Sequence, residues 1–410
     1  MILVGAIAVL ILVTSVLWIG AWLYGTISED FKAPEPWRWF VACIAPMMIA
    51  VYGLKKRNLC TSGAVAGVII GFLLTLSNLC FFAALLSFFF IGSRATKFKS
   101  HLKRKLEIDF KEGGQRNWIQ VVCNGGVAAW LAIIYMIEVG CTELPINFKR
   151  HYTSSWLAMA VLGSLSCCCG DTLASELGTV IGESSPRLIT NFKIVPKGTN
   201  GGISAAGTIA SGIGGLLVGA AYYAVLLATL QDLPLVENPP QWPLLLVATL
   251  SGILGSMIDS LLGATVQYSG INQKTGVIVE RPDKNVEHIS GHALLDNHSV
   301  NLLASILTAL LSPAIASTIW VHFCVNFYDI MADFSFNTDI HYVTMTITIT
   351  VNFISPNGQL KWEVCSVSKT YIYMKNCCIW NDFLKFEFEK LIVDEKGIHN
   401  VCLHVKYKGE

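Results

Sequence analysis

The stretch that decides the fold is SSWLAMAVLGSLSCCCGDTLASELG, residues 154–178. It begins as a nearly unbroken apolar run and ends in a polar motif that contains Asp171 and Glu176. About twenty apolar residues cross a bilayer as a helix, because each backbone polar group must be hydrogen-bonded within the segment. Carboxylates beside such a span are costly in lipid and by default mark a functional site.

The whole chain has the composition of a membrane protein. Of its 410 residues, 53% are hydrophobic and 14% are charged, whereas a soluble domain carries roughly 25% charged residues. The formal net charge is +1 and there is no basic tail, so the electrostatic footprint of nucleic-acid binding is missing. We therefore expect an all-α polytopic membrane protein and exclude a soluble enzyme and a nucleic-acid partner. No pattern in the sequence indicates an oligomeric state.

Apolar runs fit for membrane helices recur along the chain, at about residues 2–24, 38–54, 62–92, 118–138, 155–170, 207–230, 243–263 and 298–322. The run 62–92 is too long for one straight span and short for two, although Ser77 and Asn78 near its middle could form a turn. Basic segments flank it at 55–57 and 94–105. Since cytoplasmic loops are enriched in Lys and Arg, both flanks lie on one side only if the run crosses twice. The result is about nine transmembrane helices.

This topology assigns the connecting loops to two sides. It puts 93–117, 171–206 and 264–297 in the cytosol, whereas 231–242, which has no Lys or Arg, falls outside. The sequon Asn297-His298-Ser299 would then be cytosolic and unmodified. No retention or transit signal is evident, so the endoplasmic reticulum or another endomembrane is the default expectation.

Residues 323–410 differ in character from the membrane domain 1–322. Residues 341–353 alternate with period two, and Pro356-Asn357-Gly358 is typical of a turn. We expect a C-terminal β-rich or disordered appendage, explained by an alternative terminal exon or an extended gene model.

Polar residues gather at the ends of four spans. The sets are Arg116, Gln120 and Asn124, at four-residue steps on one helical face; Asp171, Ser175 and Glu176; Asp259, Ser260 and Gln267; and Asp296, Asn297 and Asn301. Under the nine-span topology all four sets face the cytosol. The sequence therefore predicts one site at that membrane face.

The loop 183–206 adds Arg187, Lys193 and Lys197, then Gly198, Gly201 and Gly202 just before a helix. Glycine amides, a helix N-terminus and lysines together suit a phosphate, and nearby carboxylates suit Mg²⁺. Other interpretations stay open: Lys193 and Lys197 could belong to a solvated positive loop, and Asp259 could pair helices by a hydrogen bond. The glycines of residues 207–219 are expected to pack helices closely.

Five motifs, in this order, resemble the transmembrane protein 19 family: GQRNWIQVVCNGG, CGDTLASELG, VPKGTNGGISAAGT, GSMIDSLLGATVQ and LLDNHSVNLL. The resemblance covers roughly residues 1–322 and is strongest to the animal members. The family includes the phytyl-phosphate kinase of plant plastids and many prokaryotic membrane proteins, and it is distantly similar to polyprenol kinases and phosphatidate cytidylyltransferases. Its members usually end soon after the last span, and the present chain continues.

The residues and the resemblance together imply a set of roles. Asp171, Glu176 and Lys197 are expected to be catalytic, and Mg²⁺ is expected on Asp171, Glu176, Asp259 and Asp296. Nucleotide and substrate contacts are expected from Asn124, Gly125, Ser175, Lys193, Gly198, Thr199, Asn200, Gly201, Gly202, Asn297 and Asn301. The expected reaction moves a phosphoryl group from CTP or another NTP to an isoprenoid monophosphate, phytyl or prenyl. A membrane cytidylyltransferase, a transporter or scramblase, and a non-catalytic scaffold are the alternatives.

Overall fold

The computed structural model describes residues 34–98, 114–181, 185–229 and 239–334, four strands beyond them, and scattered positions among the first 25 residues. By its internal contacts the chain divides into two units, Met1–Cys324 and Val325–Glu410. The predicted first span, 2–24, lies almost entirely outside the described residues.

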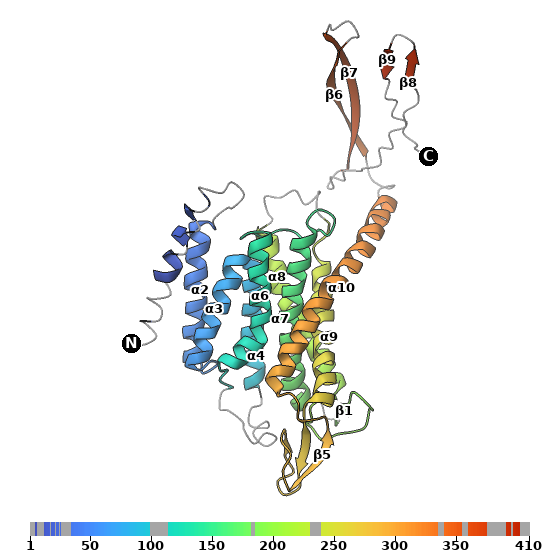
Figure 1. Ribbon diagram of the computed structural model, residues 1–410. Helices are drawn as coiled ribbons and strands as arrows, with labels where there is room; N and C mark the ends of the chain where they lie inside the picture. Colours follow the sequence, from blue (N-terminus) through green and yellow to red (C-terminus); the bar gives the residue numbers. More distant parts are fainter. Residues whose placement is uncertain are drawn as a thin grey trace. The chain divides into compact units, whose positions relative to one another are not determined.

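The first unit is a bundle of helices that lie side by side (Figure 1). They are α2 (Pro36–Lys55), α3 (Thr61–Ser77), α4 (Leu79–Lys97), α6 (Trp118–Glu138), α7 (Tyr152–Ile181), α8 (Ala205–Thr229), α9 (Pro243–Val266) and α10 (Asn297–Phe334), whose residues from Val325 onward fall in the second unit. Within the described part of the chain, 7 helices are long and apolar enough to cross a membrane, and α3, with 17 residues, is a shorter apolar helix. The predicted polytopic, mostly helical fold is confirmed.

The run 62–92 is a pair of helices broken at Asn78. The Asn78 backbone is extended, and its side chain accepts a hydrogen bond from the Cys80 amide at 2.8 Å, which caps α4. At the far end of α4, the Lys97 Nζ donates at 2.6 Å to the carbonyl of Lys56, which caps the end of α2. The end of α4 therefore lies beside the short connection between α2 and α3, and the run passes along the bundle twice, as the basic flanks predicted.

Helix α7 is the centre of the bundle, and small residues let its neighbours approach closely. A Cβ on Gly170 would lie 2.7 Å from the carbonyl oxygen of Gly252 on α9. A Cβ on Gly214 of α8 would lie 3.0 Å from the Cys169 carbonyl group on α7. Membrane helices pack in this way because van der Waals contact, and not the hydrophobic effect, holds them together. The close packing predicted for the glycines of α8 is present.

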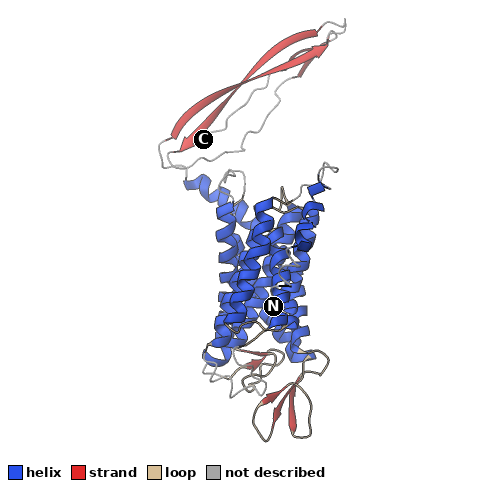
Figure 2. Cartoon of the chain, turned by 90° about the vertical axis from the view of Figure 1, so that its left-hand side faces the viewer, coloured by secondary structure: helices blue, strands red, loops and turns tan. Residues whose placement is uncertain are grey.

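The strands of the first unit lie at one end of its helices (Figure 2). Strand β1 (Arg187–Leu188) pairs with β2 (Gly202–Ile203), and a second sheet has the order β4 (Ile278–Val279), β3 (Ser269–Asn272), β5 (Val286–Ser290). All pairings are antiparallel. These strands connect the helix ends that carry the predicted polar residues.

The second unit contains two hairpins. Strand β6 (Ile340–Ile354) pairs antiparallel with β7 (Leu360–Met374), and β8 (Leu391–Asp394) pairs with β9 (Gly397–Val401). The β character expected from the alternating segment is therefore seen in the described strands. The predicted turn at 356–358 lies outside the described residues. Helix α10 continues to Phe334, beyond the predicted span end at 322.

Candidate functional site

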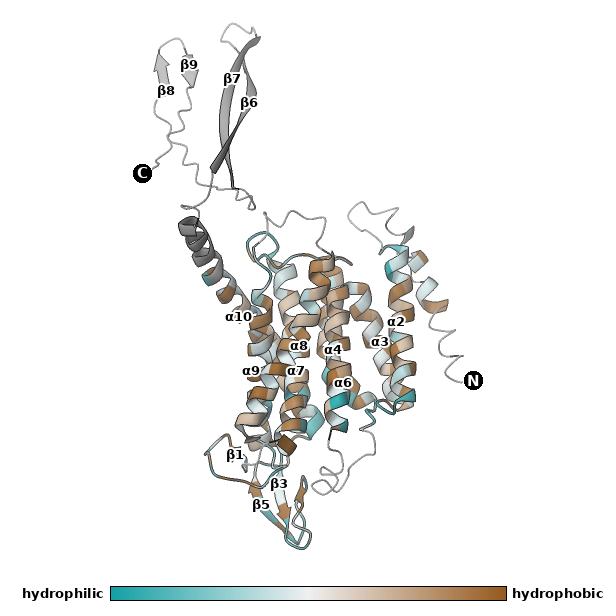
Figure 3. Cartoon of the chain, turned by 180° about the vertical axis from the view of Figure 1, so that it is seen from behind, coloured by the Kyte–Doolittle hydropathy of each residue, from teal (hydrophilic) through white to brown (hydrophobic). Residues whose placement is uncertain are grey.

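The four predicted polar sets lie at one end of the bundle. Helices α6, α8 and α10 begin there, and α4, α7 and α9 end there, which is why motifs far apart in sequence meet. Figure 3 shows the middle of each helix in apolar colours and the strongest hydrophilic colour in the loops and helix ends. The scarce charges of the apolar domain are thus collected at its edges.

Asp171 on α7 and Asp259 on α9 form the centre of the site. Ser256, one helical turn before Asp259, donates from its Oγ to Asp171 Oδ1 at 3.4 Å. The two carboxylates are close enough to interact electrostatically, and both side chains are half-buried. Among the residues that the structure describes, neither carboxylate forms an ion pair with a basic side chain. The two carboxylates therefore lie together with no basic partner among the described residues.

Asn301 connects this pair to two further helices. With its amide oriented to satisfy the surrounding acceptors, Asn301 on α10 donates to Asp259 Oδ2 and to the Asn297 carbonyl, each at 3.0 Å. The side-chain amides of Asn301 and Asn124, on α6, approach to 3.5 Å. Four helices, α6, α7, α9 and α10, thus contribute polar side chains to the cluster, and α9 contributes two of them, Ser256 and Asp259.

The glycine-rich loop lies against the last turns of α9. A Cβ on Gly201, whose φ is +79°, would lie 2.6 Å from the carbonyl oxygen of Ser260, the neighbour of Asp259. The Asn200 amide donates to Ser269 Oγ at 3.0 Å, and the Gly202 amide donates to the Thr199 carbonyl at 3.1 Å. The glycines therefore serve the turn and its contact with α9, and the Gly202 amide is occupied within the loop.

The predicted helical face of Arg116, Gln120 and Asn124 needs correction. Helix α6 begins at Trp118 with Asn117 as its N-cap, so Arg116 precedes the helix and forms a β-bridge with Leu59. Gln120 completes a capping box, in which its Oε1 accepts from the Asn117 amide at 3.1 Å. The start of a helix depends on its cap, which a four-residue spacing does not reveal.

Several predicted residues lie outside the central cluster. Ser175 is exposed and bonds the Asp171 carbonyl of its own helix at 3.0 Å, and Lys193 is exposed in the loop after β1. Gly125 is buried, and a Cβ there would lie 3.3 Å from Ile70 on α3. In the described part of the chain, no three His, Cys, Asp or Glu residues are grouped as a metal site would require. Glu176 and Asp296 are therefore not joined to the Asp171–Asp259 pair.

Asp296 is an exposed helix cap. Its Oδ1 accepts a hydrogen bond from the Ser299 amide at 2.9 Å in the first turn of α10. This hydrogen bond favours the ionised carboxylate and holds the pKa of Asp296 below its ordinary value. Capping thus accounts for the residue in this structure.

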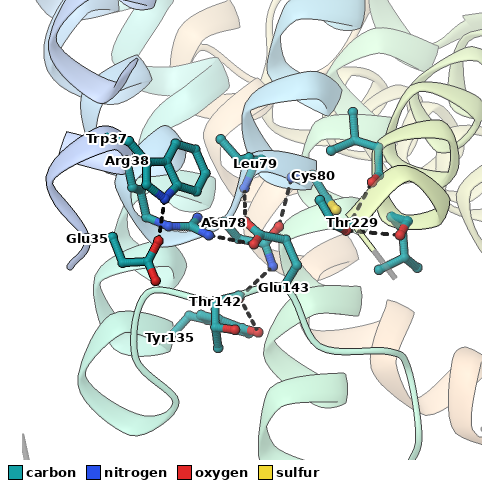
Figure 4. A network of polar contacts seen from close by, with 12 residues as sticks. Glu35, Trp37, Arg38, Asn78, Leu79, Cys80, Tyr135, Thr142, Glu143 and Thr229 are labelled. Atoms are coloured by element: carbon teal, nitrogen blue, oxygen red, sulfur yellow. Dashed lines mark hydrogen bonds and ion pairs between the residues drawn. The ribbon is translucent and has the colours of Figure 1, made fainter. Parts of the chain in front are cut away.

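A second polar network, at the other end of the bundle, was missed by the sequence analysis (Figure 4). The Arg38 guanidinium on α2 forms a bidentate ion pair with Glu143, with distances of 2.6 Å from Nη1 to Oε1 and 2.5 Å from Nη2 to Oε2. The two side chains are buried, with exposed fractions of 7% and 9%. Glu143 also accepts from the backbone amide of Leu79 at 2.8 Å, and the side-chain Nδ2 of Asn78 donates to the Thr142 carbonyl at 3.2 Å. The signal that could have pointed to it is Arg38, a charge at the edge of an apolar run.

The family model described as "Integral membrane protein DUF92" matches residues 44–309, which include the central cluster. The chain belongs to the DUF92 family. Protein PGR of Arabidopsis thaliana is 38% identical over 275 residues, which cover 67% of this chain and 95% of that protein. Protein VTE6, chloroplastic, of the same organism is 27% identical over 251 residues, 59% of this chain and 68% of that protein.

A further relative comes from an archaeal species and not from a plant. The uncharacterized membrane protein MJ0933 of Methanocaldococcus jannaschii is 27% identical over 283 residues, 69% of this chain and 96% of that protein. No solved structure matches the chain. As a DUF92 member, the chain is an integral, multi-pass membrane protein whose match includes α3 to α9 in full.

Proposed function

We propose that this DUF92 protein is a lipid-phosphate kinase, which transfers a phosphoryl group from CTP or another NTP to an isoprenoid monophosphate. The observation that carries the proposal is the pairing of Asp171 and Asp259 beside Asn301 and Asn124, at the membrane edge of an apolar bundle. The resemblance to a family that includes a phytyl-phosphate kinase supports the same reaction. Animal-type transmembrane protein 19 membership and an endomembrane location belong to the proposal.

The donor set fits Mg²⁺. This ion is commonly held by one or two carboxylates together with substrate phosphate oxygens, so a group of three protein ligands is not required. The paired carboxylates of Asp171 and Asp259 lack a described basic partner, and their mutual repulsion would be relieved by a cation. A bound Mg²⁺ would supply charge neutralisation for the donor phosphates.

The reaction requires the protein mainly to position the nucleotide and the lipid phosphate. An oxygen of the acceptor monophosphate forms a bond to the γ-phosphorus of the NTP, and the bond from that phosphorus to the β–γ bridging oxygen breaks. The products are a lipid diphosphate and an NDP. The acceptor is already anionic, so no strong base is needed, and alignment with charge stabilisation accounts for catalysis.

The remaining roles follow from position. The loop that contains Lys197 and Gly198 contacts the last turns of α9 through Gly201, which lies against Ser260, the neighbour of Asp259. This position suits the loop to the donor phosphates. Asn301 orients Asp259 through its hydrogen bond. Glu176 lies near enough to interact with the Arg116 guanidinium, toward α4 and α6, so we assign it to that side of the site.

Product analysis with labelled nucleotide tests the proposal. The purified protein, with farnesyl monophosphate and MgCl₂, is given CTP or ATP labelled at the γ- or the α-phosphorus. The proposal expects label from the γ-position in farnesyl diphosphate. Label from the α-position of CTP in the lipid would identify a cytidylyltransferase, and absence of lipid product with either nucleotide and either farnesyl or phytyl phosphate would favour a transporter or scaffold.

A further inference from the structure

A cavity of about 80 Å³ lies among α2, α3, α4 and α6, beside the central cluster. Its walls are apolar, with Ile49, Ile70, Leu85 and Phe89 among the lining residues. A single water needs roughly 10–15 Å³ of such space, and apolar cavities tend to stay dry or to take apolar ligands. The cavity thus suits a hydrocarbon segment, whose remaining length would lie between helices in the bilayer.

Three polar residues line the same cavity, and they come from one short segment: Arg116, Gln120 and Asn124. The Gln120 side chain is engaged in the α6 capping box, and Asn124 contacts Asn301. Arg116 is therefore the cation at the polar end of an otherwise apolar space. A cavity with one charged end matches an amphiphile with one charged end.

The backbone of Arg116 is held in place on both sides. Its amide donates to the Asn58 carbonyl at 3.0 Å, and its carbonyl accepts from the Cys60 amide at 3.1 Å. The guanidinium lies over the Phe88 ring, 5.8 Å from the ring centre, and donates from Nη1 to Ser93 Oγ at 3.3 Å. This cation is thus fixed before any ligand arrives, which lowers the entropic cost of binding.

The Arg116 guanidinium has more N–H donors than its hydrogen bond to Ser93 uses. Arginine presents five N–H groups in a planar fork that fits a phosphate. Arg116 forms no ion pair with any described carboxylate, although Glu176 is near enough to interact electrostatically. Burial lowers the pKa of Arg116 from its ordinary value, so its surroundings leave the charge poorly compensated. Among the described residues, no anion forms an ion pair with this guanidinium, so a ligand anion could do so.

We propose that the cavity among α2, α3, α4 and α6 binds a single-chain lipid monophosphate, with the phosphate on Arg116 and the chain against the apolar walls. The proposal rests on the proposed function and names the acceptor site of that reaction. Asn124, which lines the cavity and contacts Asn301, connects it to the Asp171–Asp259 pair. The acceptor phosphate would thereby lie next to the donor phosphates.

Equilibrium binding of tritiated farnesyl monophosphate tests the proposal without nucleotide or Mg²⁺. The protein is held in phosphatidylcholine nanodiscs, with folding checked by size exclusion and thermal unfolding. We expect saturable binding, and we expect Arg116→Gln to raise the half-saturating concentration roughly tenfold or more. Arg94→Gln removes an exposed cation of α4 at the same end and should leave binding unchanged.

A second pair of variants tests the apolar part. Gly67 lines the cavity, and a Cβ there meets no atom within 4 Å, so Gly67→Leu fills the space without a backbone clash. Gly126, next to the lining residue Gly125, does not line the cavity, and a Cβ there makes an ordinary contact of 3.4 Å with Val122. Gly67→Leu should weaken binding, and Gly126→Leu should not.

Competition experiments show whether the affinity comes from the phosphate, from the hydrocarbon chain or from both. Farnesol, which lacks the phosphate, and inorganic phosphate, which lacks the chain, should each compete poorly. Equal competition by either compound, or wild-type binding by both Arg116→Gln and Gly67→Leu, would overturn the proposal. If Arg116→Gln does not fold, unchanged binding by Gly67→Leu overturns it alone. Binding without phosphoryl transfer would refute the kinase function and leave this site standing.

Discussion

Asn301 on α10 donates a hydrogen bond to Asp259 Oδ2 on α9 at 3.0 Å. The contact restrains a carboxylate that also faces Asp171, so the geometry of the site depends on a helix that contributes no charge to its centre. Groups that orient a metal ligand typically contribute 10–100-fold to metal affinity or activity.

Asn301→Leu is therefore expected to raise the Mg²⁺ concentration for half-maximal lipid phosphorylation by roughly 10–100-fold. The reason is that Asp259 loses its donor while both carboxylates remain. Thr318→Val, farther along the same helix, serves as the control, because the Thr318 hydroxyl donates to the Ala314 carbonyl of its own helix. An unchanged Mg²⁺ dependence for Asn301→Leu would argue against this orienting role.

Gly201→Ala is expected to displace the glycine-rich loop from α9. Its φ is +79°, and the new Cβ would lie 2.6 Å from the Ser260 carbonyl oxygen. Left-handed backbone alone costs about 1–2 kcal/mol for a residue with a Cβ, and the clash adds to it. Gly276→Ala is the matched control, since Gly276 has φ +68° and nothing within 4 Å of a Cβ.

Thermal unfolding and the KM for nucleotide measure this effect. Gly201→Ala should unfold at a lower temperature than Gly276→Ala and should bind nucleotide more weakly. Equal behaviour of the two variants would mean that the contact with α9 is unimportant.

The Arg38–Glu143 ion pair is expected to be costly to break from one side. Glu143→Leu leaves the Arg38 charge buried without a partner, for which a loss of about 3–5 kcal/mol is typical. Adding Arg38→Met removes that stranded charge and should restore part of the loss. Unfolding in detergent compares the wild type with the two variants, and a double variant less stable than Glu143→Leu would contradict the interpretation.

Asp296 gives a pH-dependent prediction. Because the Ser299 hydrogen bond lowers its folded-state pKa, the stabilisation is present above the ordinary pKa of about 3.9 and is lost as pH falls through the lowered value. Asp296→Ala should cost about 1 kcal/mol at neutral pH and progressively less in acid. Asp296→Ser, which keeps a capping oxygen, should match the wild type at neutral pH. A loss of phosphorylation in this stable variant would indicate a metal ligand.

The sequence predicts the membrane fold, and it also singles out the two carboxylates that the structure brings together, for one physical reason. Charges are rare in apolar spans, so Asp171 and Asp259 stand out, and the alternating direction of the helices brings them to one end. The turn at Asn78 is predicted by the same logic, from the basic segments on both flanks.

The rest depends on contacts that no local pattern encodes. Arg38 and Glu143 are separated by 105 residues. The sequence around each residue gives no indication of its partner. Arg116 differs from its predicted place because Asn117 starts the helix after it. The short sheet β3–β5 forms within a segment whose Lys, Asp and Gly residues are typical of a loop.

The central claim is that the Asp171–Asp259 pair supports phosphoryl transfer to a lipid monophosphate. Its most direct test is the rate of farnesyl diphosphate formation from γ-labelled CTP or ATP by purified wild-type protein, Asp171→Asn, Asp259→Asn and the control Asp283→Asn, an exposed carboxylate in a loop at the same end. We predict product with the wild type and the control, and a loss on the order of 10²-fold or more in the two site variants. Wild-type rates in Asp171→Asn and Asp259→Asn would contradict the account.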